Sequence, residues 1–498
     1  MLMLSLSILV VALWTVVRWF QTGGHDSAAA IALLASAAVG FTLGALLRNA
    51  SRRDSGNLGR REAMLLVSTA WLAGAALAAL PFFLWAYTQS TASEDHPFRS
   101  YLNCYFEAMS GLTTTGATII GDGHRIAELP APLLLWRALT QWLGGLGIVV
   151  LFVAVLPTLG VGGKKLFQAE TPGPRAAGVK PRIRETARLL WLIYLGLTLA
   201  LVAALCGTGL DPFDAICHTF TTVASGGFST RDSSIAEFTI TQQSIIVLFM
   251  VLSGVNFGIF HLIISGRFKQ ALTDVELRLY LGILLVGSLA VAWSLANQGR
   301  IQGEGDAGFA VALRHGVVQT VAIQTSTGFC VTDFDRWHFA PKAILVLLMF
   351  IGASAGSTGG GVKIIRLLIA AKVFVAEIER IFRPNVVRPI KIGGSPVDFN
   401  LRLSTMVYLL TILVIFATGT LVIMALETGR HCDLTTAATA CIATLNNIGP
   451  GLSRVGAVEH YGWFSAPSKI VLITLMALGR LELYALLVLL TPRFWHTQ

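Results

Sequence analysis

Four short segments in this sequence share one pattern, in which a hydroxyl or amide residue is followed within two positions by a glycine. The segments are Thr114-Thr115-Gly116-Ala117, Ser225-Gly226-Gly227-Phe228, Ser326-Thr327-Gly328-Phe329 and Asn447-Ile448-Gly449-Pro450. Each follows a short helical run of mixed polarity and lies between two long apolar segments. Successive copies are roughly 100 to 120 residues apart, about the length of two membrane helices and a re-entrant loop. We therefore predict four copies of one helix, pore loop, helix unit in a single chain.

The composition supports a membrane location. Of the 498 residues, 54% are hydrophobic and only 13% are charged, and the mean hydropathy is +0.69. These values exclude an ordinary water-soluble globule and indicate a polytopic membrane protein. The net charge of +10 does not indicate nucleic-acid binding, because the basic residues cluster on alternate loops between apolar segments. The six cysteines form no CxxC pair, so we expect no metal centre, disulfide framework or cofactor in this chain.

The predicted fold is an all-α polytopic membrane protein with four M1-P-M2 repeats (helix, re-entrant pore loop, helix) in a pseudo-fourfold arrangement, preceded by two extra transmembrane helices. Apolar runs at residues 1–17 and 27–47 form the first two spans. The loop from Asn49 to Glu62 carries four arginines and is placed in the cytoplasm, together with the N-terminus. The predicted divisions are 1–62 for the N-terminal helices and their loop, 63–161 for repeat 1, 162–188 for a cytoplasmic linker, 189–276 for repeat 2, 277–375 for repeat 3, 376–402 for a second cytoplasmic linker and 403–498 for repeat 4.

The positions of individual helices follow from the apolar runs. The first repeat starts with a helix from Ala63 to Tyr87, kinked or interrupted at Pro81, and the last span runs from about Ser468 to Leu490. The short pore helices are predicted near Tyr101–Gly111, Pro212–Val223, Val311–Gln324 and Leu434–Thr444. The first tip lies between an outward and a returning span and therefore faces the outside.

The four tips have the chemistry of a cation filter. Glycine permits the backbone dihedrals that turn carbonyls inward, and stacked carbonyls can replace the water shell of an ion. No ring of Asp or Glu occurs at the tips, so potassium fits better than sodium or calcium. Since the four tips differ in sequence, we expect weaker potassium over sodium discrimination than four identical chains would give. The predicted filter residues are Thr114, Thr115, Gly116, Ala224, Ser225, Gly226, Gly227, Ser326, Thr327, Gly328, Asn446, Asn447, Ile448 and Gly449.

A run of ten small residues, from Gly352 to Gly361, interrupts the returning span of the third repeat. Five of them are glycines, each about 1 kcal/mol less favourable than alanine in a helix, so the run is predicted to be an intramembrane loop. Such backbone is tolerated only inside protein or beside water, and we interpret the loop as a gate below the filter. The alternative is a passive kink for close helix packing. The predicted gate residues are Gly352, Gly356, Ser357, Thr358, Gly359, Gly360, Gly361 and Arg480.

The same run matches part of the spacing of a phosphate-binding loop. Val362 occupies the lysine position of that motif, however, and no strand precedes it, so nucleotide binding is not predicted here.

Arg480 lies inside the apolar stretch of the last span. A charge so far from either interface should face the protein interior or water, and we predict that it points into the pore, where it would repel cations at rest. Glu482 is two positions away, so the two are not expected to pair on one helix face. The alternative is a structural pairing of Arg480 with a neighbouring helix.

The polar segment from Gly162 to Arg188 contains seven basic residues and three prolines. Two interpretations of this segment are open: it is a topological anchor, or it is a docking surface for a soluble cytoplasmic partner.

Further motifs follow one another in order along the chain. They are AETPGP (Ala169 to Pro174), PRIRETARLLW (Pro181 to Trp191), GASAGSTGGGVKIIR (Gly352 to Arg366) and LGRLE (Leu478 to Glu482). With the four tips, they make nearly the whole chain resemble the Trk-type potassium uptake proteins of bacteria, the TrkH branch of the TrkH/KtrB superfamily. One departure is Ala353-Ser354, which stands where Gly-Cys is expected and bears only on fine gating.

That resemblance implies a gated potassium uptake pore in the bacterial inner membrane, and a homodimer in which each chain has its own pore. It also implies a cytoplasmic TrkA-type ring of nucleotide-binding subunits as a regulatory partner. Two other functions were weighed. A secondary transporter would show inverted repeats, but the four units here share one orientation. A membrane enzyme would require a nucleophile and base set, and none is recognisable in the sequence.

Overall fold

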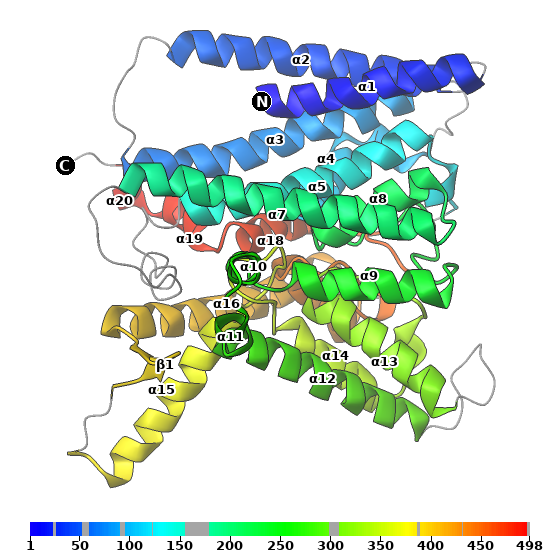
Figure 1. The fold of residues 1–498 in the computed structure, drawn as a ribbon. Helices are drawn as coiled ribbons and strands as arrows, with labels where there is room; N and C mark the ends of the chain where they lie inside the picture. The colour runs from blue at the N-terminus through cyan, green and yellow to red at the C-terminus, as the bar shows by residue number, and fades with distance from the viewer. Residues whose placement is uncertain are drawn as a thin grey trace.

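The computed structural model describes residues 1–22, 26–51, 59–89, 95–121, 123–154, 179–297, 308–385, 389–430 and 432–495. Helices dominate this part of the chain (Figure 1). Strands β1 (Lys391–Ile392) and β2 (Ser395–Pro396) form a small antiparallel hairpin beside the middle of α15 (Ile364–Phe382), where Lys372 Nζ donates to the Lys391 carbonyl. Helix α15 extends away from the other helices (Figure 1). Residues 162–178 of the predicted linker, including AETPGP, lie outside the described residues.

Three long helices form one edge of the molecule (Figure 1). They are α1 (Leu2–Thr22), α2 (Ser27–Ser51) and α3 (Arg60–Thr88), with α1 packed on α2 and α2 packed on α3. An interruption at Pro81 is wrong, because α3 continues through it, and a kink there stays a prediction. Three residues before this proline, the Ala78 carbonyl accepts a hydrogen bond of 3.0 Å from Trp136 Nε1.

The four short helices are present and largely buried. They are α4 (Tyr101–Leu112), α8 (Pro212–Val223), α13 (Phe309–Gln324) and α17 (Leu434–Leu445). Two of them start at an aspartate cap: Asp211 accepts hydrogen bonds from the amides of Phe213 and Asp214, and Asp433 accepts one from Thr436 N at 2.9 Å. Their predicted bounds agree with these to within two residues.

The remaining helices connect these elements. They are α5 (Ala131–Ala154), α7 (Val179–Gly207), α9 (Ile240–Ser253), α10 (Phe257–Ile264), α11 (Phe268–Leu272), α12 (Val275–Ala296), α14 (Phe339–Met349), α16 (Phe399–Leu426), α18 (Ala466–Arg480), α19 (Tyr484–Leu487) and α20 (Pro492–Trp495). Single turns of 3-10 helix occur at Pro97–Arg99, Ile126–Glu128, Phe334–Arg336, Ser453–Val455 and Val488–Leu490. Within the described residues, six helices are long and apolar enough to cross a membrane, or up to eight if two bent pairs each count as one span.

Those two bent pairs differ from the continuous spans expected from the sequence. The chain turns by 95° between α9 and α10 and by 116° between α18 and the segment from Tyr484 to Leu490. At the second break, Glu482 and Leu483 have φ values of +58° and +60°, which non-glycine residues rarely adopt. The Leu483 amide donates to the Leu478 carbonyl at 2.9 Å, which closes the end of α18. The predicted last span, from about Ser468 to Leu490, is therefore not one continuous helix.

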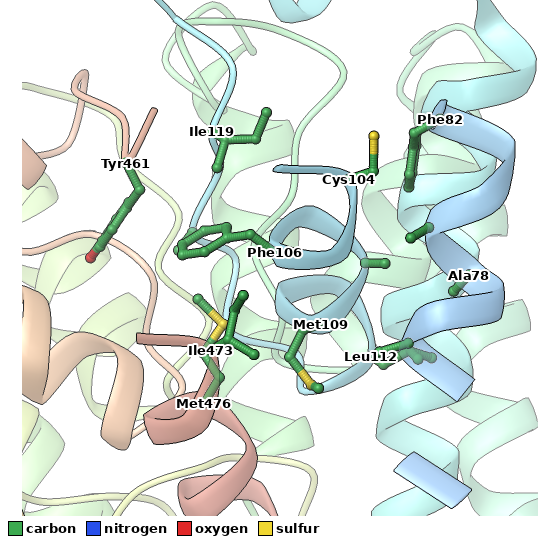
Figure 2. Close-up of a cluster of buried hydrophobic side chains, with 14 of the residues drawn as sticks. Ala78, Phe82, Cys104, Phe106, Met109, Leu112, Ile119, Tyr461, Ile473 and Met476 are labelled. Atoms are coloured by element: carbon green, nitrogen blue, oxygen red, sulfur yellow. The ribbon is translucent and has the colours of Figure 1, made fainter. Parts of the chain in front are cut away.

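The first short helix is held in an apolar cluster (Figure 2). Phe106 and Met109 on α4 lie between Phe82 of α3 and Met476 of α18. The ring of Tyr461 lies 5.8 Å from the ring of Phe106 (centroid to centroid), and the Tyr461 hydroxyl donates a 2.8 Å hydrogen bond to the Gly449 carbonyl. Core packing thus fixes two of the tip segments relative to each other.

Close packing between α12 and α13 leads to a stability prediction. A Cβ at Gly316 would lie 2.9 Å from Ala292 N and 3.0 Å from Ser288 O, which are backbone atoms of the facing helix. We expect Gly316→Ala to lower the free energy of unfolding by about 1 to 3 kcal/mol through overpacking. The matched control is Gly282→Ala on α12, where a Cβ meets nothing within 4 Å and should be neutral or stabilising. Thermal unfolding of the purified proteins in detergent checks this, and equal melting temperatures would contradict it.

Candidate functional site

The four predicted tips share one backbone conformation. The residue two positions before each tip glycine is in the left-handed region, with φ of +52° at Thr114, +54° at Ser225, +56° at Ser326 and +53° at Asn447. The tip glycines follow with φ of +81° at Gly116, +76° at Gly227, +76° at Gly328 and +97° at Gly449. Left-handed non-glycine residues are strained by about 1 kcal/mol or more, and such strain is typical of functional sites. Its fourfold recurrence marks these tips as equivalent structures.

Each tip also closes the C-terminal end of its short helix. The amide just before the tip glycine donates to a carbonyl in the last turn of that helix. The bonds are Thr115 N to Ser110 O at 2.8 Å, Gly226 N to Thr221 O at 2.8 Å, Thr327 N to Ala322 O at 2.9 Å and Ile448 N to Ala443 O at 2.8 Å. Helix C-terminal ends carry partial negative charge, so this geometry directs four such ends at the tips.

The tips meet in a closed ring. Ideal Cβ atoms built on the tip glycines show which atoms lie against them. Gly116 faces the carbonyl oxygen of Gly226, Gly227 faces that of Thr327, Gly328 faces that of Ile448, and Gly449 faces that of Thr115. All four Cβ atoms would lie within 3.0 Å of the facing oxygen. Every tip is therefore in backbone contact with the next, and the fourth returns to the first.

A cavity of about 320 Å³ opens on one side of this ring and is bordered by all four tip glycines. Its other lining residues come from the segments that follow the tips, such as Arg231, and include Arg137 of α5. The Arg231 guanidinium pairs with Asp214 and Glu237, each at 2.8 Å. Hydrogen bonds from Ser233 and from Arg231 lower the pKa of the Glu237 carboxyl, which stays ionised beside this cation. The cavity thus carries compensated charges at its rim and backbone carbonyls at its floor.

The polar side chains of the tips are buried, and several of them bond to one another or to nearby backbone carbonyls. Asn447 Nδ2 donates to Thr115 Oγ1 and to the Met476 carbonyl, both at 3.0 Å. The hydroxyls of Thr325 and Thr327 are 2.8 Å apart. Asn446 Nδ2 donates to Met349 O at 2.7 Å. The predicted filter residues from all four tips, Thr114, Thr115, Gly116, Ala224, Ser225, Gly226, Gly227, Ser326, Thr327, Gly328, Asn446, Asn447, Ile448 and Gly449, are therefore brought together.

The glycine-rich run between α14 and α15 is a loop, and it lies against the tips. Gly360 N donates to Ser326 Oγ at 2.5 Å, and the Thr358 and Ser225 hydroxyls are 2.9 Å apart. A Cβ on Gly359 would lie 3.0 Å from the Thr325 carbonyl oxygen. These partners precede the tip glycines in sequence, whereas the cavity residues follow them. The loop and the cavity are therefore on different sides of the ring.

The loop is also anchored to the end of α8 and to the break between α9 and α10. Thr358 Oγ1 donates to Val223 O at 3.0 Å and to Ser253 O at 3.2 Å. Phe257 N donates to Gly356 O at 3.1 Å, and Ser357 Oγ donates to Ser354 O at 2.7 Å. At its base, Gly352 N donates to Val362 O at 2.9 Å. Gly361, with φ of +71°, packs against Gly352.

Arg480 ends α18 and is 2% exposed. Its Nη1 donates to Thr358 O at 3.0 Å and its Nη2 to Gly144 O at 3.1 Å, so the guanidinium connects α18, the glycine loop and α5. The Glu482 carboxylate instead accepts a hydrogen bond from Arg366. The expectation that Arg480 faces a pore stays a prediction.

Several charged residues that were not among the predicted site residues also lie near the tips or the loop, and Glu276 accepts a hydrogen bond from the Ala355 amide of the loop at 2.7 Å. Lys363 Nζ donates to the Gly359 carbonyl, and the Arg366 guanidinium lies 4.0 Å from the centroid of the Tyr408 ring. Glu107 and Arg137 form a buried ion pair of 2.7 Å beside the first two tips. The sequence carried one signal for Glu107, because it stands nine residues before a tip glycine, as do His218 and Gln319.

Comparisons with known proteins agree with this architecture. The family model TrkH, described as cation transport protein, matches residues 35–497. The chain is 38% identical over 464 residues to the Trk system potassium uptake protein TrkH of Escherichia coli (strain K12), covering 92% of this chain and 91% of that protein. It is 30% identical over 462 residues to TrkG of the same organism, covering 92% and 90%. The crystal structure of the potassium transporter TrkH from Vibrio parahaemolyticus superposes with a TM-score of 0.83 and 34% identity, covering 99% of each chain. The chain therefore belongs to the TrkH family of membrane cation transport proteins.

Proposed function

We propose that this chain conducts potassium into a bacterial cell through a gated pore whose selectivity filter is the ring of four tips. The observation that carries this proposal is the closed set of backbone contacts from Gly116 through Gly227 and Gly328 to Gly449. A ring of carbonyl oxygens at the ends of four helices can replace the water shell of a monovalent cation. The relatives at 38% identity are themselves named potassium uptake proteins.

Potassium is favoured over sodium because it loses its hydration water at a smaller free-energy cost, which neutral carbonyl oxygens can offset. The ring carries no carboxylate: its polar side chains are hydroxyls and amides, such as those of Thr115 and Asn447. The pseudo-fourfold repeat arrangement belongs to the same proposal, and the shared tip conformation supports it. The differing tip sequences support the expectation of moderate rather than strict discrimination.

The gate in this proposal is the loop from Gly352 to Gly361 together with Arg480. The loop touches the tips on the side away from the cavity, through Ser225 and Ser326. Arg480 holds the loop at Thr358 O with a charge that opposes cations. Opening would require the loop to leave the ring and the guanidinium to lose its carbonyl partners.

The topology and partners are also proposed. The basic loops support a cytoplasmic N-terminus. The resemblance implies a location in the inner membrane, a homodimer and a cytoplasmic TrkA-type nucleotide-binding ring. The domain divisions predicted from the sequence belong to the same proposal. Helix α15 and the β1–β2 hairpin project from the helical body with the basic residues Lys372, Arg380 and Lys391, as expected of a cytoplasmic face (Figure 1).

Rubidium flux tests this function. Proteoliposomes loaded with potassium and containing the purified chain should accumulate labelled rubidium from outside, and an excess of external potassium should compete better than sodium. A secondary transporter would require a gradient of a second solute, which can be omitted from both sides. Absence of uptake above protein-free liposomes, with and without the cytoplasmic partner, would contradict the proposal.

A further inference from the structure

One position on the short helices recurs beside the tips. Nine residues before the tip glycine, the first three short helices carry Glu107, His218 and Gln319, all with at most 1% exposure. Gln319 Nε2 donates to the Phe329 carbonyl at 3.3 Å, and His218 Nε2 is 3.0 Å from Ser229 Oγ. The side chain at this position therefore ties the segment after each tip back to its own helix.

The fourth short helix has Ala440 at this position, which carries no polar side-chain atom. Its tip segment is tied by other groups instead. Leu452 N donates to Thr439 Oγ1 at 2.9 Å, and the Tyr461 hydroxyl donates to Gly449 O at 2.8 Å. Each of the four segments is thus fixed by a different chemical group, and a buried carboxylate performs this role only beside the first tip among these positions.

Both oxygens of the Glu107 carboxylate accept hydrogen bonds from neighbouring residues. Its carboxylate accepts a hydrogen bond from Ile119 N at 3.0 Å and from Thr118 Oγ1 at 3.1 Å, both on the segment after the first tip. Arg137 of α5 supplies the opposite charge, with its Nη2 at 2.7 Å and its Nε at 2.8 Å from Glu107 Oε1. The two side chains are at most 1% exposed, so neither ion is solvated by bulk water.

Arg137 extends this connection to the second tip. Its Nη1 donates to Ser229 O at 3.2 Å, and its guanidinium carbon lies 4.1 Å from the centroid of the Phe228 ring. One helical turn later, Gln141 Nε2 donates to Gly226 O at 2.8 Å, and Gln141 Oε1 accepts from Phe228 N at 3.1 Å. One face of α5 thus holds the second tip, and the ion pair joins that face to the first tip.

We propose that Glu107 and Arg137 are a positioning pair that sets the spacing between the first and second tips and thereby the preference for potassium over sodium. The pair acts through the backbone that it holds. Replacing a buried ion pair by apolar groups is often neutral or stabilising, so such a pair is weak evidence for a role in stability. Its hydrogen bonds to two different tip segments are what a geometric role requires. The inference rests on the proposed function of the ring.

The primary test is Glu107→Gln, which keeps the size of the side chain but removes its charge. We expect the ratio of rubidium to sodium flux in proteoliposomes to fall roughly tenfold, because a charge-assisted buried hydrogen bond corresponds to about a factor of ten. The matched control is Glu427→Gln. Glu427 is also a buried carboxylate, 1% exposed, and it accepts hydrogen bonds from Ser465 N and Oγ at the start of α18. The control should leave the flux ratio unchanged.

Two milder variants keep the inference testable if Glu107→Gln does not fold. Thr118→Val removes one hydroxyl bonded to Glu107, and Arg137→Lys keeps the charge but loses the forked geometry. Each should lower the ratio in the same direction, by about threefold or more, with flux still present. Measurable flux with an unchanged ratio in the folded variants overturns this inference. A wild-type chain without any flux would instead overturn the proposed function, so the two failures are distinguishable.

Discussion

Gly116→Ser should lower the ratio of rubidium to sodium flux by at least about tenfold, since displacing one ring oxygen at a cost of about 1.4 kcal/mol in potassium-like coordination corresponds to a factor of ten. The backbone there has φ of +81°, and a Cβ would lie closer than 3.0 Å to the carbonyl oxygen of Gly226. Because that oxygen belongs to the ring, the new side chain cannot be accommodated without displacing a proposed ion ligand. Gly328→Ser should act in the same way, since its Cβ would meet the Ile448 carbonyl oxygen. Paired rubidium and sodium uptake into proteoliposomes measures the change.

The control for this experiment is Gly209→Ser. Gly209 also has φ of +81°, but a Cβ there meets nothing within 4 Å. The two variants therefore share the backbone strain and differ only in the contact with the ring. If Gly209→Ser lowered the flux ratio as much as Gly116→Ser, strain alone would account for the effect. An unchanged ion preference in Gly116→Ser would remove the assignment of the tips as a filter.

Arg480→Ala should raise the basal rubidium flux of the chain without its partner by about tenfold or more. A unit charge roughly 10 Å from an ion, at an effective dielectric constant near 20, contributes about 1.7 kcal/mol to a barrier. The substitution also removes the hydrogen bonds to Thr358 O and Gly144 O, so the loop loses an anchor. Loss of the guanidinium charge and loss of its two hydrogen bonds both favour opening of the gate.

Arg336→Ala is the control for removal of a cation. Arg336 has a side chain that is 67% exposed and pairs with Asp333 outside the ring and the loop, so its loss should not change basal flux. Arg480→Lys keeps the charge and should retain most of the barrier. A basal rate in Arg480→Ala equal to or below that of the unsubstituted chain would contradict the role of this side chain in a gate.

The tips and the short helices before them could be predicted from local sequence pattern. Glycine with a preceding hydroxyl or amide recurs four times, and the short helices before these tips begin and end within two residues of the predicted bounds. These features depend on residues close together in sequence, through turn chemistry and helix caps such as Asp433. The glycine loop was predictable for the same reason, because ten consecutive small residues cannot maintain a helix.

The break in the last span could not be predicted from local sequence pattern. No proline marks the turn at Glu482 and Leu483, and the apolar run continues through it. What stabilises the break is long-range: the Glu482 carboxylate pairs with Arg366, which is more than one hundred positions away in sequence. A strained local conformation persists only when the surrounding structure holds it.

The sequence by itself determined that this is a membrane chain, that it has four equivalent tips and that a small-residue loop interrupts its third returning helix. Tertiary structure alone decided that the tips close into a ring, that Arg480 binds the Thr358 carbonyl and that Arg137 joins the first two tips. The physical reason is the distance along the sequence over which each kind of interaction acts. Composition and backbone preference act within a few residues, whereas the partner of a buried charge is chosen by packing among helices far apart along the chain.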